Sequence, residues 1–195
     1  MPKAIKNLKF RCTGCGNCCK DPVLPLTDDD IRRIVAGTGD DPLKFIRYTD
    51  RHHIEMDDEP EAFASFRQGK RVLVMRQDRN GCHYLGKDDR CTIYEHRPLG
   101  CRAFPFEPTY GKDKKLRSLK IIDVIECEYE LDGKNSARRI VAQQEQYETM
   151  NERFYVQVAE WNRLQKRRQR AGKRPDIARR FLEFLGVLEP KLREG

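Results

Sequence analysis

Four cysteines stand within eight residues near the start of the chain, in the segment Cys12-Thr-Gly-Cys15-Gly-Asn-Cys18-Cys19. The first three have the Cys-x2-Cys-x2-Cys spacing with which bacterial ferredoxins hold three corners of an iron–sulfur cluster, the fourth thiolate coming from elsewhere. The glycines at 14 and 16 let the backbone fold tightly around one centre. This spacing indicates metal ligation by sulfur rather than ordinary packing.

A second set of cysteines is spread along the chain and consists of Cys82, Cys91, Cys101 and Cys127, which brings the total to eight. Eight thiolates are enough for two complete four-thiolate shells. Zinc knuckles also use Cys-x2-Cys, but they usually pair it with a second such element, and this sequence has no second one. The wide spacing favours a site assembled by the fold over a simple zinc ribbon.

The adjacent pair Cys18-Cys19 bears on the kind of metal. Neighbouring residues tend to point their side chains apart, so one mononuclear ion could not use both thiols well. Two nearby sites, or one polynuclear cluster, would accommodate them. The alternative for Cys19, and equally for Cys127, is a buried thiol with no metal role.

The segment from Cys91 to Phe106 holds a second group of candidates. Arg97 and Arg102 bracket Cys101, and cationic donors beside thiolates offset negative charge and can tune a metal's potential. The alternative for Arg97 is an ion pair with Glu95. Tyr94 either supplies a phenol near the site or packs, and a histidine at 83 or 96 could replace one thiolate.

Other candidate ligands lie in a polar stretch formed by His52, His53, Glu55, Asp57 and Asp58. These side chains could bind a hard or borderline metal, or they could line a polar surface loop. The sequence has no glycine-rich phosphate loop with a lysine and no serine nucleophile elbow.

The composition sets the physical limits. Only 38% of the residues are hydrophobic and 36% are charged, and the mean hydropathy is −0.82. A metal that binds only the folded state would add to the stability of such a polar chain. The sequence shows neither a signal peptide nor an apolar stretch of membrane-spanning length, so we expect a cytoplasmic protein with reduced thiols and no membrane association. In a secreted protein the eight cysteines could instead form four disulfides.

The net charge of +8 is concentrated near the C-terminus. Between residues 160 and 180, nine basic residues face only Glu160 and Asp176, a local balance of +7. The basic residues are Arg163, Lys166, Arg167, Arg168, Arg170, Lys173, Arg174, Arg179 and Arg180. This basic segment, residues 163–180, could contact an acidic partner or nucleic acid, or it could be a solvated helix surface.

Periodicity predicts the elements that position these residues. Thr27 with Asp30 forms a capping-box pattern for a helix that ends at Gly37, and Asp41-Pro42 begins a second short helix. Strands are expected at residues 71–75 and 116–125, with turns at 79–81 and 86–90.

A change to helical periodicity marks the C-terminal part of the chain. A long amphipathic helix is expected over residues 136–170, with Trp161 on its apolar stripe, and a last helix follows residue 175. We therefore expect an α+β fold: a small sheet and cysteine-bearing loops organised by metal and packed by C-terminal helices. The expected domains are a metal-binding domain over residues 1–132 and a helical extension over residues 133–195.

Two motifs resemble a known family. Phe10-Arg11-Cys12-x-x-Cys15-Gly16-x-Cys18-Cys19 and Cys91-x-Ile93-Tyr94-x-x-Arg97-Pro98-x-x-Cys101-Arg102-x-Phe104-Pro105-Phe106 are similar to the CxxCxxCC cysteine-cluster (YkgJ-like) family of zinc- or iron-chelating domains. The resemblance covers roughly residues 8 to 130. It implies metal chelation by Cys12, Cys15, Cys18, Cys19, Cys82, Cys91, Cys101 and Cys127. Flagellin lysine-N-methylase resembles a larger relative with the same cysteine cluster.

Two functions follow as hypotheses. The first is an iron–sulfur protein, with a [4Fe–4S] cluster favoured, whose role is redox or cluster-dependent catalysis as an oxidoreductase or a methyltransferase-like enzyme. The second is a structural zinc module that binds a partner or nucleic acid.

Overall fold

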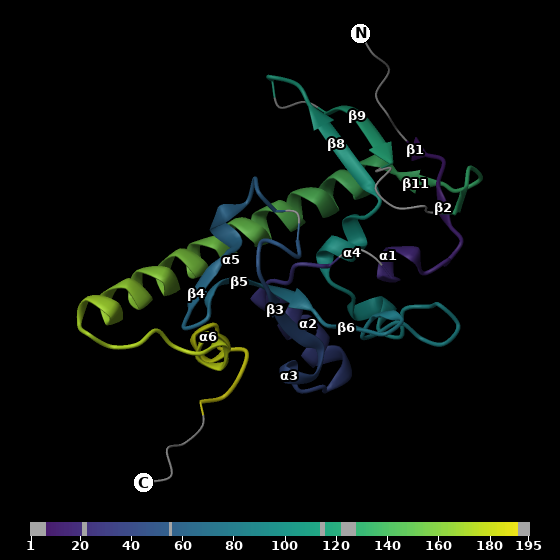
Figure 1. The fold of residues 1–195 in the computed structure, drawn as a ribbon. Coiled ribbons are helices and arrows are strands. Elements are labelled where there is room, and N and C mark those ends of the chain that lie inside the picture. Colours follow the sequence, from purple (N-terminus) through teal and green to yellow (C-terminus); the bar gives the residue numbers. More distant parts are fainter. Residues whose placement is uncertain (1–6, 21–22, 55, 114–115, 122–127, 191–195) are drawn as a thin grey trace. The chain divides into compact units, whose positions relative to one another are not determined.

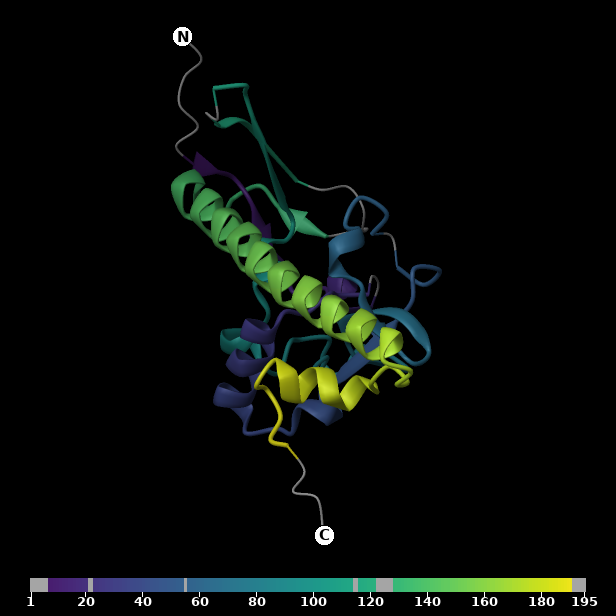
Figure 2. The same cartoon turned by 90° about the vertical axis from the view of Figure 1, so that its left-hand side faces the viewer.

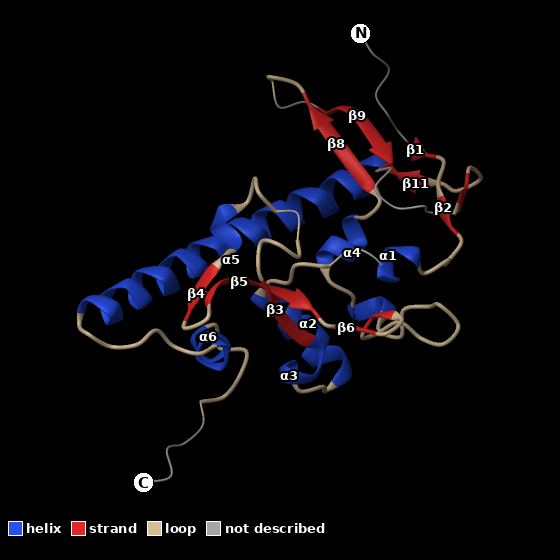
Figure 3. Ribbon diagram, viewed as in Figure 1, coloured by secondary structure: helices blue, strands red, loops and turns tan. Residues whose placement is uncertain are grey.

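The computed structural model describes residues 7–20, 23–54, 56–113, 116–121 and 128–190 (Figure 1). Helices and small antiparallel sheets both occur, which confirms the α+β expectation (Figure 3). The chain forms two compact units, one from Met1–Pro22 with Gln77–Thr149 and the other from Val23–Arg76 with Met150–Gly195. We call them unit 1 and unit 2. Each takes chain from both sides of the domain boundary expected at residue 132, and that boundary stays a prediction.

Unit 1 contains every cysteine of the sequence. Its elements are β1 (Asn7–Leu8), β2 (Arg11–Cys12), α1 (Asn17–Lys20), β6 (Gln77–Asp78), β7 (Gly81–Cys82), a 3-10 turn (Tyr94–His96), α4 (Leu99–Ala103), β8 (Phe106–Tyr110), β9 (Leu116–Ile121), β10 (Tyr129–Glu130) and β11 (Asn135–Ser136). The strands pair antiparallel as β1–β11, β2–β10, β6–β7 and β8–β9. Its apolar core consists of Phe10, Phe106, Leu119, Ala137 and Ile140.

Unit 2 is built on a three-stranded antiparallel sheet in the order β3-β5-β4. Its elements are α2 (Asp28–Thr38), α3 (Pro42–Phe45), β3 (Ile46–Thr49), a 3-10 turn (Pro60–Ala62), β4 (Ala64–Phe66), β5 (Gly69–Met75), most of α5 (Ala137–Arg170) and α6 (Ala178–Phe184). The expected strand at 71–75 is confirmed as the buried part of β5. The expected strand at 116–125 is found as β9 up to Ile121, and its remainder lies outside the described residues.

The N-terminal cap of α2 is the one predicted from the sequence, whereas its C-terminal end differs from the prediction. The Thr27 side chain accepts from the Asp30 backbone N–H, and the Asp30 carboxylate accepts from the Thr27 backbone, so the predicted capping box is present. The predicted end at Gly37 is wrong, because α2 continues to Thr38. Gly39 terminates it in the left-handed conformation, with φ of 73° and its N–H bonded to the Val35 carbonyl, a position that suits a residue without Cβ.

The long helix is confirmed as α5, with Phe154, Val158 and Trp161 buried on one side. Figure 2 shows α6 beside the C-terminal part of α5. Their contact is aromatic, since the ring centroids of Trp161 and Phe181 are 5.2 Å apart. In the described part of the chain, no helix combines the length and the apolar character needed to cross a membrane.

Candidate metal centre

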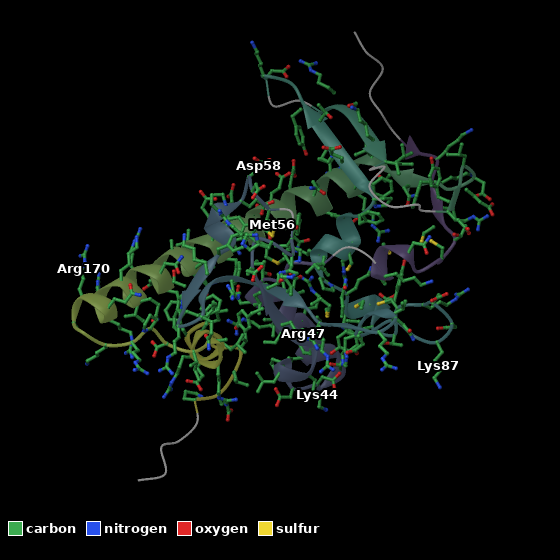
Figure 4. The ribbon with its side chains drawn as sticks, in the orientation of Figure 1. Lys44, Arg47, Met56, Asp58, Lys87 and Arg170 are labelled. Carbon is green, nitrogen blue, oxygen red and sulfur yellow. The ribbon has the colours of Figure 1, made fainter. Side chains whose placement is uncertain are left out.

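Cys82 and Cys91 lie at the two ends of a closed loop. The loop begins where the β6–β7 hairpin ends, and the Leu85 N–H bonds to the Cys82 carbonyl at 2.8 Å. At its far end Leu85 and Cys91 form an antiparallel β-bridge, and the Thr92 N–H bonds to the Tyr84 carbonyl at 2.9 Å. The predicted turn over residues 86–90 is confirmed by the 2.8 Å bond from the Gly86 N–H to the Arg90 carbonyl. Lys87 in this turn is labelled in Figure 4.

Helix α1, which carries Cys18 and Cys19, packs against this hairpin and loop through two glycines. A Cβ on Gly81, whose φ is 118°, would lie 2.4 Å from the backbone oxygen of Cys19. A Cβ on Gly16 would lie 2.7 Å from the backbone oxygen of Asp89. The Lys20–Asp89 ion pair at 3.1 Å adds a third link. Because these approaches leave no room for a side chain, the glycines fix α1 beside Cys82.

Cys101 lies in the middle of the short helix α4. Arg102, in the same helix, holds the loop that precedes it. Its guanidinium donates to the backbone carbonyls of Arg97, at 3.2 Å, and Glu95. The Arg97 guanidinium lies over the Tyr94 ring, 3.9 Å from its centroid, a cation–π contact that fixes its direction. Arg102 thus braces the loop, while Arg97 influences the thiols.

Electrostatic interactions show which thiols lie near one another. Burial raises the pKa of Cys101, and the Cys82, Cys18 and Cys91 thiols raise it further, while Arg97 lowers it. Burial likewise raises the pKa values of Cys82 and Cys91, and the Cys18 thiol raises both further. The pKa of Cys18 is raised first by its side-chain hydrogen bond with Cys19. We call Cys18, Cys19, Cys82, Cys91 and Cys101 the thiol cluster.

Cys12 and Cys15 precede α1, in β2 and in the loop that follows it. Cys12 lies in β2 opposite Tyr129 of β10, and its sulfur accepts from the Gly14 N–H at 3.4 Å. Both thiols are accessible, Cys12 being exposed and Cys15 half-buried. Cys127 lies outside the described residues. The role of all three as metal ligands therefore stays a prediction.

All seven described cysteines are free thiols. Within the described ranges, no three or more histidine, cysteine, aspartate or glutamate side chains are grouped in an arrangement that could hold a metal ion. The thiol cluster nevertheless suits a thiophilic metal by its donor chemistry: sulfur atoms from three separate segments share one neighbourhood, with a cation beside them. Cys18, Cys82, Cys91 and Cys101 are the thiols that would have to close on zinc or iron to hold it there.

Two of the histidine candidates, His83 and His53, lie beside aspartates. His83 Nδ1 is 2.9 Å from Asp78 Oδ2, and His96 ends the 3-10 turn before α4. In unit 2, His53 Nδ1 is 2.8 Å from Asp50 Oδ1, while His52 lines a cavity of about 340 Å³. The remaining candidates in that stretch are Asp57 and Asp58, which are exposed, and Glu55, which lies outside the described residues.

Two features of the site were not singled out from the sequence as functional. The sequence indicates only a turn at Gly81, and it gives no signal for Asp89, whose backbone oxygen would lie 2.7 Å from a Cβ on Gly16. The Asn80-Gly81 pair was the one visible signal, because a glycine after asparagine often marks a positive φ. The close approach of Gly81 to Cys19 could not be predicted in this way, because the two residues are about sixty positions apart in the sequence.

A set of free thiols gathered from distant segments is typical of domains that chelate metal through sulfur. The family model of CxxCxxCC, described as "Putative zinc- or iron-chelating domain", matches residues 11–128. Because that span is more than half of the chain, the protein belongs to this family and is a metal-binding protein of the zinc- or iron-chelating type. No curated protein and no solved structure gives a match. The similarity to flagellin lysine-N-methylase stays a prediction.

Proposed function

We propose that the protein holds an iron–sulfur cluster, a [4Fe–4S] centre, and that this cluster serves a redox or cluster-dependent enzymatic role. The observation that carries the proposal is the packing of α1, with Cys18 and Cys19, against Gly81 beside Cys82, in a loop that the Leu85–Cys91 β-bridge closes. The raised pKa of Cys101, to which burial and then the Cys82, Cys18 and Cys91 thiols contribute, supports it. Four thiolates are the ligand set that a [4Fe–4S] cluster takes in proteins. Such a cluster supplies one-electron chemistry when it is bound.

The number of thiols supports iron–sulfur over a single zinc ion. A tetrahedral zinc site uses four ligands, whereas Cys19 shares a hydrogen bond with Cys18 and makes a fifth thiol in the same neighbourhood. Cys12, Cys15 and Cys127 would then remain, with Cys19, for a second set of four. Eight ligands in two sets of four would allow a second centre beside the proposed cluster.

The contacts of Arg97 support a redox role. Its guanidinium is held over Tyr94. The pKa values of Cys91 and Cys101 are raised chiefly by burial and that of Cys18 by its hydrogen bond with Cys19, and the charge of Arg97 offsets part of each rise. A fixed positive charge beside thiolates favours the more negative, reduced state of a cluster, so it raises the reduction potential. Arg97 would therefore be a residue that tunes the cluster rather than a ligand.

The test is anaerobic purification followed by iron, sulfide and zinc analysis and absorption spectroscopy. The proposal expects a brown protein that air bleaches, and dithionite should reduce it reversibly. Cys101→Ser should abolish the signal of the cluster at Cys18, while Cys12→Ser, a matched change outside the thiol cluster, should retain it. Circular dichroism checks that both variants fold. Full iron in Cys101→Ser, or equal loss in both variants, would contradict the ligand assignment.

A structural zinc module is the second candidate. Its supporting observation is that Cys82 and Cys91 lie at the two ends of a closed loop against which α1 packs, because zinc sites made of four thiolates from such segments are usually structural. A colourless protein with stoichiometric zinc, unable to accept an electron from dithionite, would favour this candidate over the first.

A further inference from the structure

The C-terminal end of α5 and the turn after it present a basic surface in unit 2. Of the nine basic residues in the segment, three are engaged by acids: Arg168 pairs with Asp176 at 3.2 Å, and Arg179 and Arg180 both pair with Glu183. The other six are exposed. They are Arg163, Lys166, Arg167, Arg170, Lys173 and Arg174, and we call them the basic surface.

Four of these cations share one face of α5. At 100° per residue, positions 163, 166, 167 and 170 fall within an arc of about 100° on a helix. The opposite face carries the buried residues Trp161 and Gln165. Burial of that face therefore fixes which way the cations point, and Figure 4 labels Arg170 near the end of the helix.

The turn that carries the other two cations is held rigidly. Gly172 has a φ of 70°. The Gly172 N–H bonds to the Gln169 carbonyl at 3.0 Å, and the Lys173 N–H bonds to the Arg168 carbonyl at 2.9 Å. These two bonds form a Schellman cap. The backbone of Lys173 is thereby tied directly to the last turn of α5.

A buried amide completes the turn. Gln165, which is 1% exposed, accepts from the Asp176 N–H at 2.8 Å and donates to the Asp176 carboxylate at 3.2 Å. The Asp176 carbonyl in turn accepts from the Arg67 N–H of the β4–β5 turn at 3.2 Å. The basic surface is thus a preorganised array, whose backbone loses little further entropy when it binds a partner.

We propose that the basic surface binds the phosphate backbone of double-stranded nucleic acid without sequence preference. Arginines form four of its six cations, and guanidinium groups match phosphate geometry. Along α5 the cations extend for about 10 Å from Arg163 to Arg170, about three base-pair steps of one strand. Residues 163–174 contain no aromatic ring for stacking unpaired bases, which favours a duplex. Leu164 is the one large apolar side chain exposed among these residues, too little for the apolar centre of a protein interface.

The test measures the affinity of the full-length protein for a fluorescent 24-base-pair DNA duplex by anisotropy, over a range of salt concentrations. Six phosphate contacts predict a slope of log K against log salt of about −5. The triple variant Arg163→Gln/Arg167→Gln/Arg170→Gln should reduce the slope to about −2.5 and weaken binding at 0.1 M salt by up to about 500-fold. Metal content should not change, so failure here is distinct from failure of the iron–sulfur proposal.

A matched control removes three charges from the same helix. Arg138, Arg139 and Arg153 are exposed on α5 outside the basic surface, and replacing all three with glutamine should leave slope and affinity close to wild type. Equal loss in both triple variants would overturn the proposal, because net charge alone would then account for binding. Tighter binding to the single strand would overturn the duplex assignment. Displacement of the duplex by polyglutamate at equal charge concentration would indicate an acidic protein partner instead.

Discussion

Gly81 gives the sharpest test of how the thiol cluster is assembled, through the substitution Gly81→Ala. The new Cβ would lie 2.4 Å from the Cys19 backbone oxygen and 2.8 Å from the Lys20 Cα. To restore even a 3.0 Å contact, the Cys19 backbone must move by about 0.6 Å. A φ of 118° adds strain for any residue with a Cβ. The three nearest atoms all belong to the main chain of Cys19 and Lys20, so a side-chain rotation cannot relieve the clash.

The magnitude follows from these two costs. Backbone strain of this kind costs about 1–3 kcal/mol, and overpacking against a fixed backbone costs about 1–3 kcal/mol more. Gly81→Ala should therefore lower the free energy of unfolding by about 2–6 kcal/mol. Because α1 carries Cys18 and Cys19, the same displacement should lower the metal content. Urea unfolding and metal analysis of the anaerobically purified protein measure both effects.

Gly14 provides the matched control. It lies between Cys12 and Cys15 with a φ of 77°, yet a Cβ built on it meets nothing within 4 Å. Gly14→Ala therefore adds strain without a clash, about 1–2 kcal/mol, and should retain wild-type metal. If Gly81→Ala kept wild-type stability and metal, or if both variants lost metal equally, the packing of α1 on Gly81 would not be what positions these thiols.

Two further predictions concern unit 2. Trp161→Ala should lower the free energy of unfolding in urea by about 3–5 kcal/mol, because the side chain is 2% exposed and packs on Phe181. Trp161→Phe should lower it less, chiefly through loss of the 2.9 Å hydrogen bond to the Ser65 carbonyl. Equal losses in the two variants would contradict this packing. Burial raises the pKa of Tyr48, whose hydroxyl donates to the Ala178 carbonyl. Above pH 10 the unfolded state therefore releases a proton that the folded state keeps. The free energy of unfolding should then fall by up to about 1.4 kcal/mol per pH unit. Tyr48→Phe should lack that component in urea titrations from pH 9.5 to 11.5; the same pH dependence in both proteins would refute it.

The elements that depend on local chemistry were predictable. The Thr27 capping box, the Pro42 helix start and the apolar stripe of α5 each rest on residues a few positions apart. The end of α2 shows the limit of this reasoning. Gly37 and Gly39 are equally plausible stop signals in the sequence, and the structure selects Gly39 because that residue takes the left-handed conformation.

The division of the thiols could not be read from spacing. Cys12, Cys15 and Cys18 look equivalent in the motif, yet the described interactions connect only Cys18 with Cys82 and Cys101. The reason is tertiary: the backbone of Cys19 in α1 packs against Gly81, while Cys12 is held in the β2–β10 pair. The sequence likewise could not separate the roles of Arg97 and Arg102. The structure does, because Arg102 donates to the Arg97 carbonyl of the loop.

X-ray absorption at the iron and zinc edges of the anaerobically purified protein tests the central claim most directly. We expect a first shell made of sulfur alone, at about 2.3 Å, with a second shell of iron if the centre is a cluster. A first shell dominated by nitrogen or oxygen, or thiols that remain unbound when metal is supplied, would contradict it.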